Sequence, residues 1–250
     1  RRKLMIWFII ATLVAFFIKG LCGFANTLIF NGILSYTANN INISPLEVVL
    51  GYPSNIILVW KERKSLNWKI WLPLTALVVA GSIPGIFLLK HTDAGLLKVI
   101  FGIAVIVIGV EMLFREMKSN RESSNRKPGG SKLVLILIGI ISGLLCGLYG
   151  VGALLAAYVS RVAENSHEFK ANICVVFVVE NTIRIILYVA TGILTLSVLK
   201  QVVILIPFML AAVFLGMKSS SVLNEKIIKK IVIILLILSG IVLIINNIPG

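Results

Sequence analysis

The sequence predicts an all-α integral membrane protein with about eight transmembrane segments. Hydrophobic residues make up 58% of its 250 residues and charged residues 14%, whereas a globular domain carries about 25% charged residues. The mean hydropathy is +1.02. Apolar stretches of about 20 residues, the length that crosses the hydrocarbon core as a helix, recur between short polar connectors. Most of these stretches lack the polar face that a core helix of a soluble protein shows.

Two of the apolar segments are too long for one simple span. The segments run approximately over 4–38, 44–60, 69–89, 95–114, 133–160, 171–190, 198–217 and 227–247. The first contains a glycine patch at 20–23, and the fifth contains another at 143–152. Glycine weakens a helix and permits a break or a close backbone approach. We therefore expect a broken helix, or a tight pair of half-helices, in each long segment.

The net charge of +14 comes from basic residues in the connectors, as membrane topology requires. No nucleic-acid motif accompanies them, so we expect no nucleic-acid partner. The linker 115–132 has six basic and two acidic residues, and the positive-inside rule places it and the connector 61–64 in the cytoplasm. The uncharged connector 39–43 fits the outside. The basic connectors 161–170 and 218–230 conflict with simple alternation of eight spans, which puts both outside.

The two halves of the chain resemble each other. A shift of 127 places Gly20 on Gly147 and Gly23 on Gly150. We expect two repeats of four segments, each with a broken, glycine-containing first helix, which gives the eight spans. An even number of segments per half gives parallel repeats and an odd number gives inverted ones, and the second-half charges leave the inverted arrangement possible. Secondary transporters commonly have either architecture, with the substrate site where the halves meet. We divide the chain into a first membrane repeat, a cytoplasmic basic linker and a second membrane repeat, at 1–114, 115–132 and 133–250.

The glycine patches predict an anion site. Unwound backbone survives in hydrocarbon only when it is buried or faces a cavity, and half-helix N-termini offer free N–H donors and partial positive charge. Gly20 and Gly147 are additional break points. The alternative is that the glycines only let helices pack closely. The candidate substrate-binding residues at the two breaks are Gly23, Asn26, Thr27, Tyr149, Gly150 and Gly152.

Glu180 and Arg184 are the sharpest functional signal. They lie four residues apart in an apolar segment, so they share one helix face. A charge near the bilayer centre costs about 3 kcal/mol or more on insertion scales, so such residues are rarely idle. We expect Arg184 to bind the substrate anion and Glu180 to orient it or carry a coupling proton, with Asn181 facing the same cavity. The alternatives are a self-neutralising structural pair or an arginine that snorkels to the interface.

Other polar residues carry weaker signals. Lys19 either attracts an anion toward the first break or marks the end of a shorter span. Ser54 and Asn55 occupy the first-half position comparable to the Glu180 region, and residues of this kind usually hydrogen-bond between helices. Ser44 and Glu47 have the spacing of a helix N-cap and its capping box, which predicts a structural role for both.

Three stretches resemble the TauE/SafE family of sulfite and organosulfonate exporter-like permeases. They read FFIKGLCGFANTLIFNGIL, GIISGLLCGLYGVGALLAAY and FVVENTIRIILYVATGILTLSVLK. The resemblance covers nearly the whole chain. It implies an α-helical permease that moves small sulfur-containing anions.

Together these features predict a secondary transporter of small anions in the plasma membrane, driven by a proton or sodium gradient. We identify no catalytic Ser/His/Asp set, phosphate loop or nucleotide-binding motif in the sequence, and we expect no enzyme activity and no cofactor. One alternative is a non-transporting membrane scaffold or sensor. A second is an intramembrane enzyme, for which only Glu180 offers a starting point.

Overall fold

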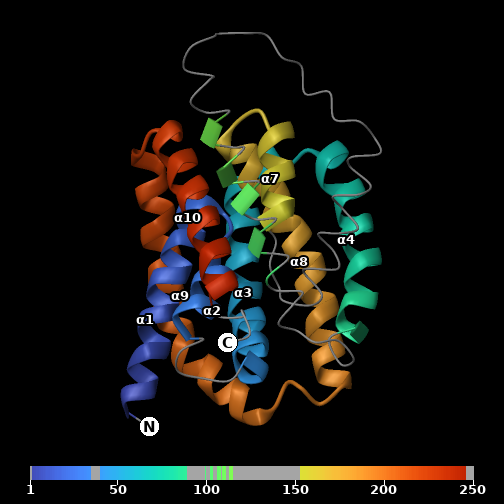
Figure 1. The fold of residues 1–250 in the computed structure, drawn as a ribbon, viewed down its shortest axis with the longest axis vertical. Helices are drawn as coiled ribbons and strands as arrows, with labels where there is room; N and C mark the ends of the chain where they lie inside the picture. Colours follow the sequence, from blue (N-terminus) through green and yellow to red (C-terminus); the bar gives the residue numbers. More distant parts are fainter. Residues whose placement is uncertain are drawn as a thin grey trace.

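The computed structural model describes residues 2–34, 40–88, scattered positions between 99 and 114, and 153–245. These residues form helices, with no strand among them, so the predicted all-α class is confirmed for the described part of the chain. The helices, in chain order, are α1 (Arg2–Cys22), α2 (Asn26–Leu34), α3 (Asn40–Glu62), the short 3₁₀ helix η1 (Arg63–Ser65), α4 (Trp68–Leu88), α7 (Ala153–Val162), α8 (Ser166–Ala190), α9 (Leu196–Val222) and α10 (Glu225–Ile245) (Figure 1).

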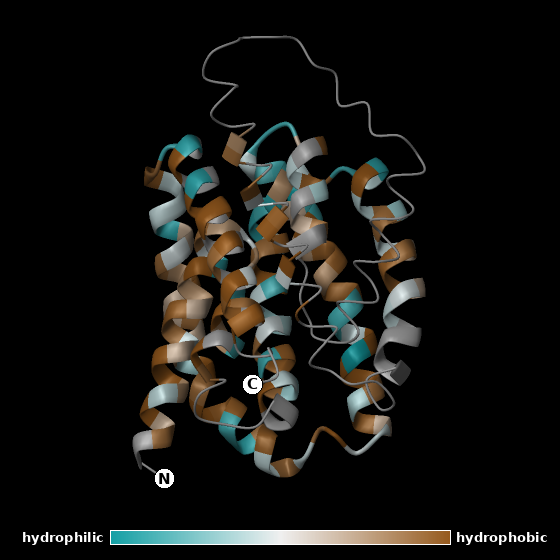
Figure 2. Cartoon of the chain, in the orientation of Figure 1, coloured by the Kyte–Doolittle hydropathy of each residue, from teal (hydrophilic) through white to brown (hydrophobic). Residues whose placement is uncertain are grey.

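Four of the described helices are long and apolar enough to cross a membrane. They cover Leu4–Cys22, Ile43–Ser65, Ser166–Ala190 and Leu196–Val222. Apolar residues predominate along the outside of the bundle (Figure 2). Val203, for example, is 67% exposed and Phe214 is 56% exposed. A surface of this kind is stable only in lipid, which identifies the chain as an integral membrane protein.

The first long segment is broken, as the sequence predicts, and it turns back on itself. Helix α1 ends at Cys22, and Gly23 (φ 87°) and Ala25 (φ 72°) adopt the left-handed backbone that a reversal of direction needs. Lys19 bonds to Asn26, and the Phe16 ring contacts the Phe30 ring edge-on with centroids 6.4 Å apart. This register shows that α2 runs antiparallel beside α1, so the segment folds as a hairpin inside the bundle.

Gly20 is not the break point that the sequence suggested. It lies inside α1, where the helix passes α9 at backbone contact distance. A Cβ added to Gly20 would lie 3.1 Å from the Cα of Gly216 and 3.0 Å from the backbone N of Met217. Gly20 and Gly216 therefore serve close helix packing, the role of small residues in membrane interfaces.

Helices α3 and α8 pack antiparallel at the centre of the bundle. The backbone N–H of Asn67, just beyond α3, donates to Asn172 of α8 at 3.0 Å. Near the other end of the pair, the hydroxyls of Ser44 and Tyr188 lie 3.1 Å apart. The buried polar residues described below lie between these two contacts.

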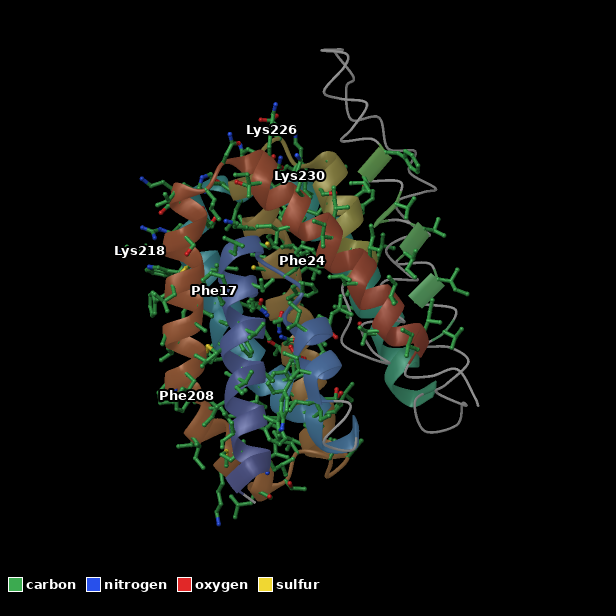
Figure 3. The ribbon with its side chains drawn as sticks, turned by 60° about the vertical axis from the view of Figure 1, so that its left-hand side comes forward. Phe17, Phe24, Phe208, Lys218, Lys226 and Lys230 are labelled. Carbon is green, nitrogen blue, oxygen red and sulfur yellow. The ribbon has the colours of Figure 1, made fainter. Side chains whose placement is uncertain are left out.

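Three basic connectors lie at one end of the molecule. His167 contacts Glu62 at 2.8 Å, Lys61 donates to the carbonyl of Met217 at 3.5 Å, and Lys170 bonds to Ser220. Figure 3 shows Lys218, Lys226 and Lys230 toward the same end. These contacts place the connectors 61–64, 161–170 and 218–230 at the same end, whereas simple alternation of eight single crossings would put the last two opposite the first.

Several sequence predictions lie outside the described residues. These are the second glycine patch with Gly147, Tyr149, Gly150 and Gly152, and the linker 115–132. Within the segment 95–114, Gly102 and Gly109 pack against α10. A Cβ added at Gly102 would lie 2.8 Å from the carbonyl oxygen of Gly240, which shows another close helix contact made through glycine.

Candidate functional site

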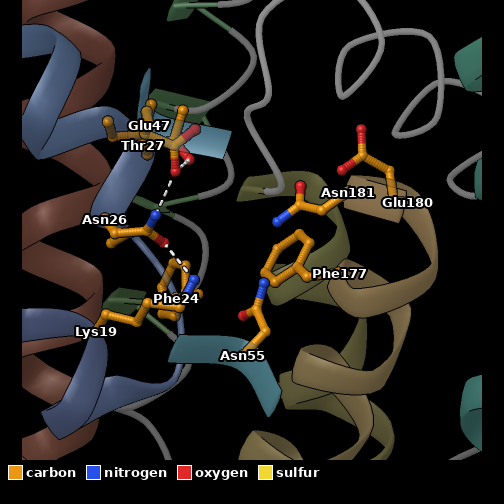
Figure 4. A pocket seen from close by; sticks show the side chains of 11 residues that line it. Lys19, Phe24, Asn26, Thr27, Glu47, Asn55, Phe177, Glu180 and Asn181 are labelled. Carbon is orange, nitrogen blue, oxygen red and sulfur yellow. Dashed lines mark hydrogen bonds between the residues drawn. The ribbon is translucent and has the colours of Figure 1, made fainter. Parts of the chain in front are cut away.

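A small cavity lies beside the helix break, between α1, α2, α3 and α8. Its volume of about 20 Å³ admits roughly one water molecule. The residues that line it are Lys19, Phe24, Ala25, Asn26, Thr27, Leu28, Glu47, Asn55, Phe177, Glu180 and Asn181 (Figure 4).

A hydrogen-bonded chain of polar side chains forms one wall of the cavity. The Nζ of Lys19 donates to Oδ1 of Asn26 at 3.0 Å, and Nδ2 of Asn26 donates to Oε1 of Glu47. The Thr27 hydroxyl donates to the same Glu47 oxygen at 2.8 Å. Lys19 also lies 5.9 Å from the centroid of the Phe177 ring, within cation–π range. Side chains from three helices, α1, α2 and α3, thus form one hydrogen-bonded network in the protein interior.

The N-terminus of α2 faces this wall. Among the described backbone bonds, Ile29 N–H donates to the carbonyl of Ala25 at 3.2 Å, which places the N–H groups of residues 26–28 before the start of the helical ladder. Such groups carry the partial positive charge of a helix N-terminus. Because residues 25–28 line the cavity, this charge is directed at the cavity rather than at lipid.

The buried amides of Asn55 and Asn181 lie across the cavity from Asn26 (Figure 4). Asn55 is fully buried, and neither polar atom of its side chain has a hydrogen-bond partner among the described residues. Gly51 keeps open the space between the two sides. A Cβ there would lie 3.3 Å from Oε1 of Glu47 and 3.6 Å from the side-chain nitrogen of Asn181. The absence of a side chain at Gly51 therefore leaves room for polar groups to meet.

Glu180 and Arg184 share a helix face, as predicted, and form an ion pair. The Nε of Arg184 lies 3.6 Å from Oε1 of Glu180, and the two side chains are 1% and 2% exposed. The Nη2 of Arg184 donates to Ser44 at 3.0 Å and to Tyr188 at 2.9 Å. The described geometry therefore excludes a snorkelling arginine. Of the pair, Glu180 lines the cavity and Arg184 does not.

The predicted site residues divide into three groups. Asn26, Thr27, Glu180 and Asn181 come together around the cavity. Gly23 ends α1 next to the cavity lining, and a Cβ added there would lie 2.9 Å from Cγ of Lys170. Tyr149, Gly150 and Gly152 lie outside the described residues.

Sequence reasoning gave Glu47 and Asn55 structural roles and left the role of Lys19 open. The predicted capping box is wrong, because α3 already begins at Asn40 and Ser44 bonds to Tyr188 instead of capping the helix. The signal that would have singled out Glu47 is a carboxylate well inside an apolar segment, the same signal that singled out Glu180. Lys19 does mark a span shorter than 4–38, since it lies in the last turn of α1, which ends at Cys22; it is also 1% exposed and lines the cavity beside the break.

The arrangement is suited to holding a small oxyanion. A lysine, side-chain amides, a hydroxyl and a helix N-terminus converge on one enclosed space, and each can donate a hydrogen bond to an anionic oxygen. Among the described residues, no group of three or more His, Cys, Asp or Glu side chains has the arrangement of a metal site.

A family description matches nearly the entire chain. The family described as sulfite exporter TauE/SafE matches residues 8–243. No curated protein and no solved structure matches the chain.

Proposed function

The chain belongs to the TauE/SafE sulfite exporter family, a family of membrane transporters, and on this premise we propose that it is a secondary transporter of sulfite, a sulfonate or a related small sulfur anion. The cavity at the break of the first helix is the proposed substrate site. Transport is driven by a proton or sodium gradient, and the family is one of transporters rather than enzymes.

One observation carries the assignment of the site: a helix starts in the middle of the bundle, with its N-terminus at a cavity lined by a buried lysine. Backbone is interrupted at membrane depth only where it is buried in protein or lines a cavity. Half-helix N-termini serve as anion sites in other transporter folds. Lys19, which is 1% exposed, adds a full positive charge at the same place.

Each side of the cavity has a proposed role. Lys19 draws the anion in, and Asn26 and Thr27 donate hydrogen bonds from the α2 side. Asn55 and Asn181 donate from the α3 and α8 side. The unsatisfied amide of Asn55 supports this division, since an orphaned buried donor gains most from a ligand.

Arg184 contributes indirectly in this proposal. It holds the Glu180 carboxylate in place, and its buried charge raises the positive potential around the cavity. Direct binding of the anion by Arg184 was expected from the sequence, but one of its terminal nitrogens donates to Ser44 and Tyr188, and Arg184 is not among the residues that line the cavity. Tyr149, Gly150 and Gly152 remain the proposed second-half contribution to the site.

We further propose two inverted repeats of four segments each, with the linker 115–132 between them. In this proposal the first segment of each repeat folds back on itself, as the α1–α2 hairpin does. Three segments of each repeat then cross the membrane, and an odd number of crossings inverts the second repeat. The shift of 127 residues places the segment 44–60 of α3 on 171–187 of α8, and these two helices run antiparallel. Antiparallel counterparts favour inverted repeats over parallel ones. Alternating access would then arise from rocking of one repeat against the other around the cavity.

The positive-inside rule orients this architecture in the plasma membrane. The connector 61–64 and the two basic connectors of the second half share one end of the bundle, which we propose to be cytoplasmic. The linker 115–132 lies on the same side in this proposal.

The proposal is tested by anion flux into proteoliposomes. Purified protein is reconstituted, and uptake of sulfite, thiosulfate, methanesulfonate and chloride is measured under imposed proton or sodium gradients. We expect gradient-driven flux of at least one sulfur anion at ten times the rate of empty liposomes. Absence of flux for every anion under both gradients, from protein that elutes as a single species, would favour the scaffold or sensor instead.

Lys19→Met tests the site within the same assay. The substitution keeps the length and apolar stem of the side chain and removes its charge. We expect at least a tenfold loss of flux, because the anion loses its nearest cation. Lys218→Met removes an exposed lysine from α9 and serves as the matched control, with unchanged flux. Equal rates for wild type and Lys19→Met would place the substrate elsewhere.

A further inference from the structure

The carboxylate of Glu47 occupies the donors that the proposed function assigns to the substrate. Its Oε1 accepts hydrogen bonds from the side chains of Asn26 and Thr27, the first two residues of α2. Glu47 comes from α3 and is 3% exposed. A carboxylate and a sulfur oxyanion offer the same chemistry, an anionic oxygen that accepts charge-assisted hydrogen bonds. The two anions therefore compete for one set of donors.

We propose that Glu47 couples transport to protons: its ionised carboxylate blocks the anion site, and a proton on Glu47 frees Asn26 and Thr27 for the substrate, so each anion moves together with one proton. This inference rests on the proposed function and names its coupling ion. Protonation adds one proton to the carboxylate oxygen, and release of that proton on the other side restores the block and expels the anion.

The charges around Glu47 favour the binding of one proton with each monovalent anion. The charged groups that interact with it are Lys19 of α1 and Arg184 and Glu180 of α8, while α2 contributes only uncharged donors. Two positive and two negative side chains sum to zero in the resting site. A monovalent anion would leave one uncompensated negative charge in the membrane interior, which is strongly disfavoured. One proton on Glu47 returns the site to neutrality.

Glu180 is less suited to this role because it forms an ion pair with an arginine. Arg184 lies 3.6 Å from Glu180 on the next helical turn. Among the described residues, no Lys, Arg or His nitrogen forms an ion pair with Glu47, and Lys19 reaches it only through Asn26. The charge of Glu47 can therefore change without breaking an ion pair, whereas neutralising Glu180 would leave Arg184 unpaired.

The cavity itself is consistent with a blocked state. Its volume of about 20 Å³ holds roughly one water, so a four-atom oxyanion fits only when a lining group moves away. On the opposite side, the fully buried amide of Asn55 has no hydrogen-bond partner among the described residues. An anion that replaced the Glu47 carboxylate at α2 would face this amide and satisfy its donor.

The experiment measures separately, in proteoliposomes, how a pH gradient and how a membrane potential drive anion flux. Uptake of ³⁵S-labelled sulfite and of methanesulfonate, whose charge does not change with pH, is measured under a pH gradient or under a potassium diffusion potential set with valinomycin. In the wild type we expect the pH gradient to raise flux at least tenfold and the potential to change it less than twofold. In Glu47→Gln we expect the potential to change flux at least tenfold and the pH gradient to change it less than twofold, because the anion now crosses without a proton and carries net charge.

Two variants sharpen the assignment. Glu180→Gln alters the cavity lining and is expected to lower the absolute rate, but it keeps the blocking carboxylate, so we expect its remaining flux still to rise at least tenfold under the pH gradient. Glu164→Gln removes an exposed carboxylate and is the matched control, with wild-type behaviour. A tenfold response to the pH gradient that persists in Glu47→Gln overturns the inference, as does a response lost in Glu180→Gln and kept in Glu47→Gln.

A measurement on the unmodified protein covers the case in which Glu47→Gln does not fold. Binding of methanesulfonate or sulfite to detergent-solubilised wild type is followed in weakly buffered solution with a pH indicator. We expect uptake of about one proton per methanesulfonate bound, and no uptake overturns the inference. Anion flux without proton coupling contradicts only the role of Glu47, whereas absence of both flux and binding for every anion contradicts the proposed transport function as well.

Discussion

The ion pair between Glu180 and Arg184 allows a quantitative test of the buried electrostatics. Replacing Arg184 by Met preserves most of the side-chain volume but removes the charge that compensates Glu180. Both side chains are at most 2% exposed, so solvent cannot take over the role of the arginine. Removing one partner of a buried pair destabilises a protein by about 3–5 kcal/mol. The loss includes the hydrogen bonds from Arg184 to Ser44 and Tyr188.

The second arm of the test replaces both partners. In Glu180→Met/Arg184→Met no charge is left unpaired, and buried pairs exchanged for apolar residues are often neutral in stability. We therefore expect the double variant to lie within about 1–2 kcal/mol of the wild type, the remainder reflecting the orphaned hydroxyls of Ser44 and Tyr188. The difference between the single and the double variant measures the coupling of the two charges.

Thermal unfolding in detergent measures the stability of the single variant and of the double variant. A loss of about 4 kcal/mol corresponds to a decrease in apparent Tm of about 8–16 °C for a chain of this length. An Arg184→Met variant that melts within about 2 °C of the wild type would refute the reasoning, because it would mean that Glu180 finds compensation elsewhere. In the flux assay, wild-type rates for a folded Arg184→Lys variant would remove Arg184 from the mechanism.

Three further predictions follow from the geometry. Gly23→Ala places a Cβ on a residue with φ of 87° and 2.9 Å from Lys170, and we expect it to lower stability by about 1–2 kcal/mol in the same thermal assay; an unchanged Tm would contradict the left-handed turn. Asn55→Leu removes a buried unsatisfied amide, so we expect about 1–3 kcal/mol of added stability together with reduced anion flux, and full flux would exclude the amide from the site. Lys64 and Thr191 are exposed and lie near opposite ends of α8. Cysteines introduced at these two positions should react with a membrane-impermeant thiol reagent from opposite sides of the membrane.

Local signals in the sequence identified part of the site. Glu180 and Arg184 stand out because charged residues in an apolar segment are unusual at any position of the fold. The break near Gly23 was also readable, since glycines interrupt an apolar run that is too long for one span. Asn26 and Thr27 followed from the break, because they are the first residues after it. Each of these inferences needs only the order of residues along one segment.

Glu47 shows where local reasoning fails. The pattern Ser44–Glu47 has the correct spacing for a capping box, yet α3 starts earlier, at Asn40. The partners of Glu47 are Asn26 and Thr27, about twenty residues away in the chain. A pattern within four residues cannot show that a hairpin from another segment supplies hydrogen bonds to the same carboxylate.

Membrane insertion, the helical class and membership of a transporter family could all be read from the order of residues, because hydropathy, segment length and family motifs depend on that order alone. Which polar groups meet depends on how the helices pack. Lys19, Glu47, Asn55 and Asn181 come from three different helices, and hydrophobic surfaces that look alike in sequence give no indication of which helix packs on which. The α1–α2 hairpin sets this arrangement, since reversing the chain at Gly23 brings the start of α2 back beside Lys19 and against the carboxylate of α3.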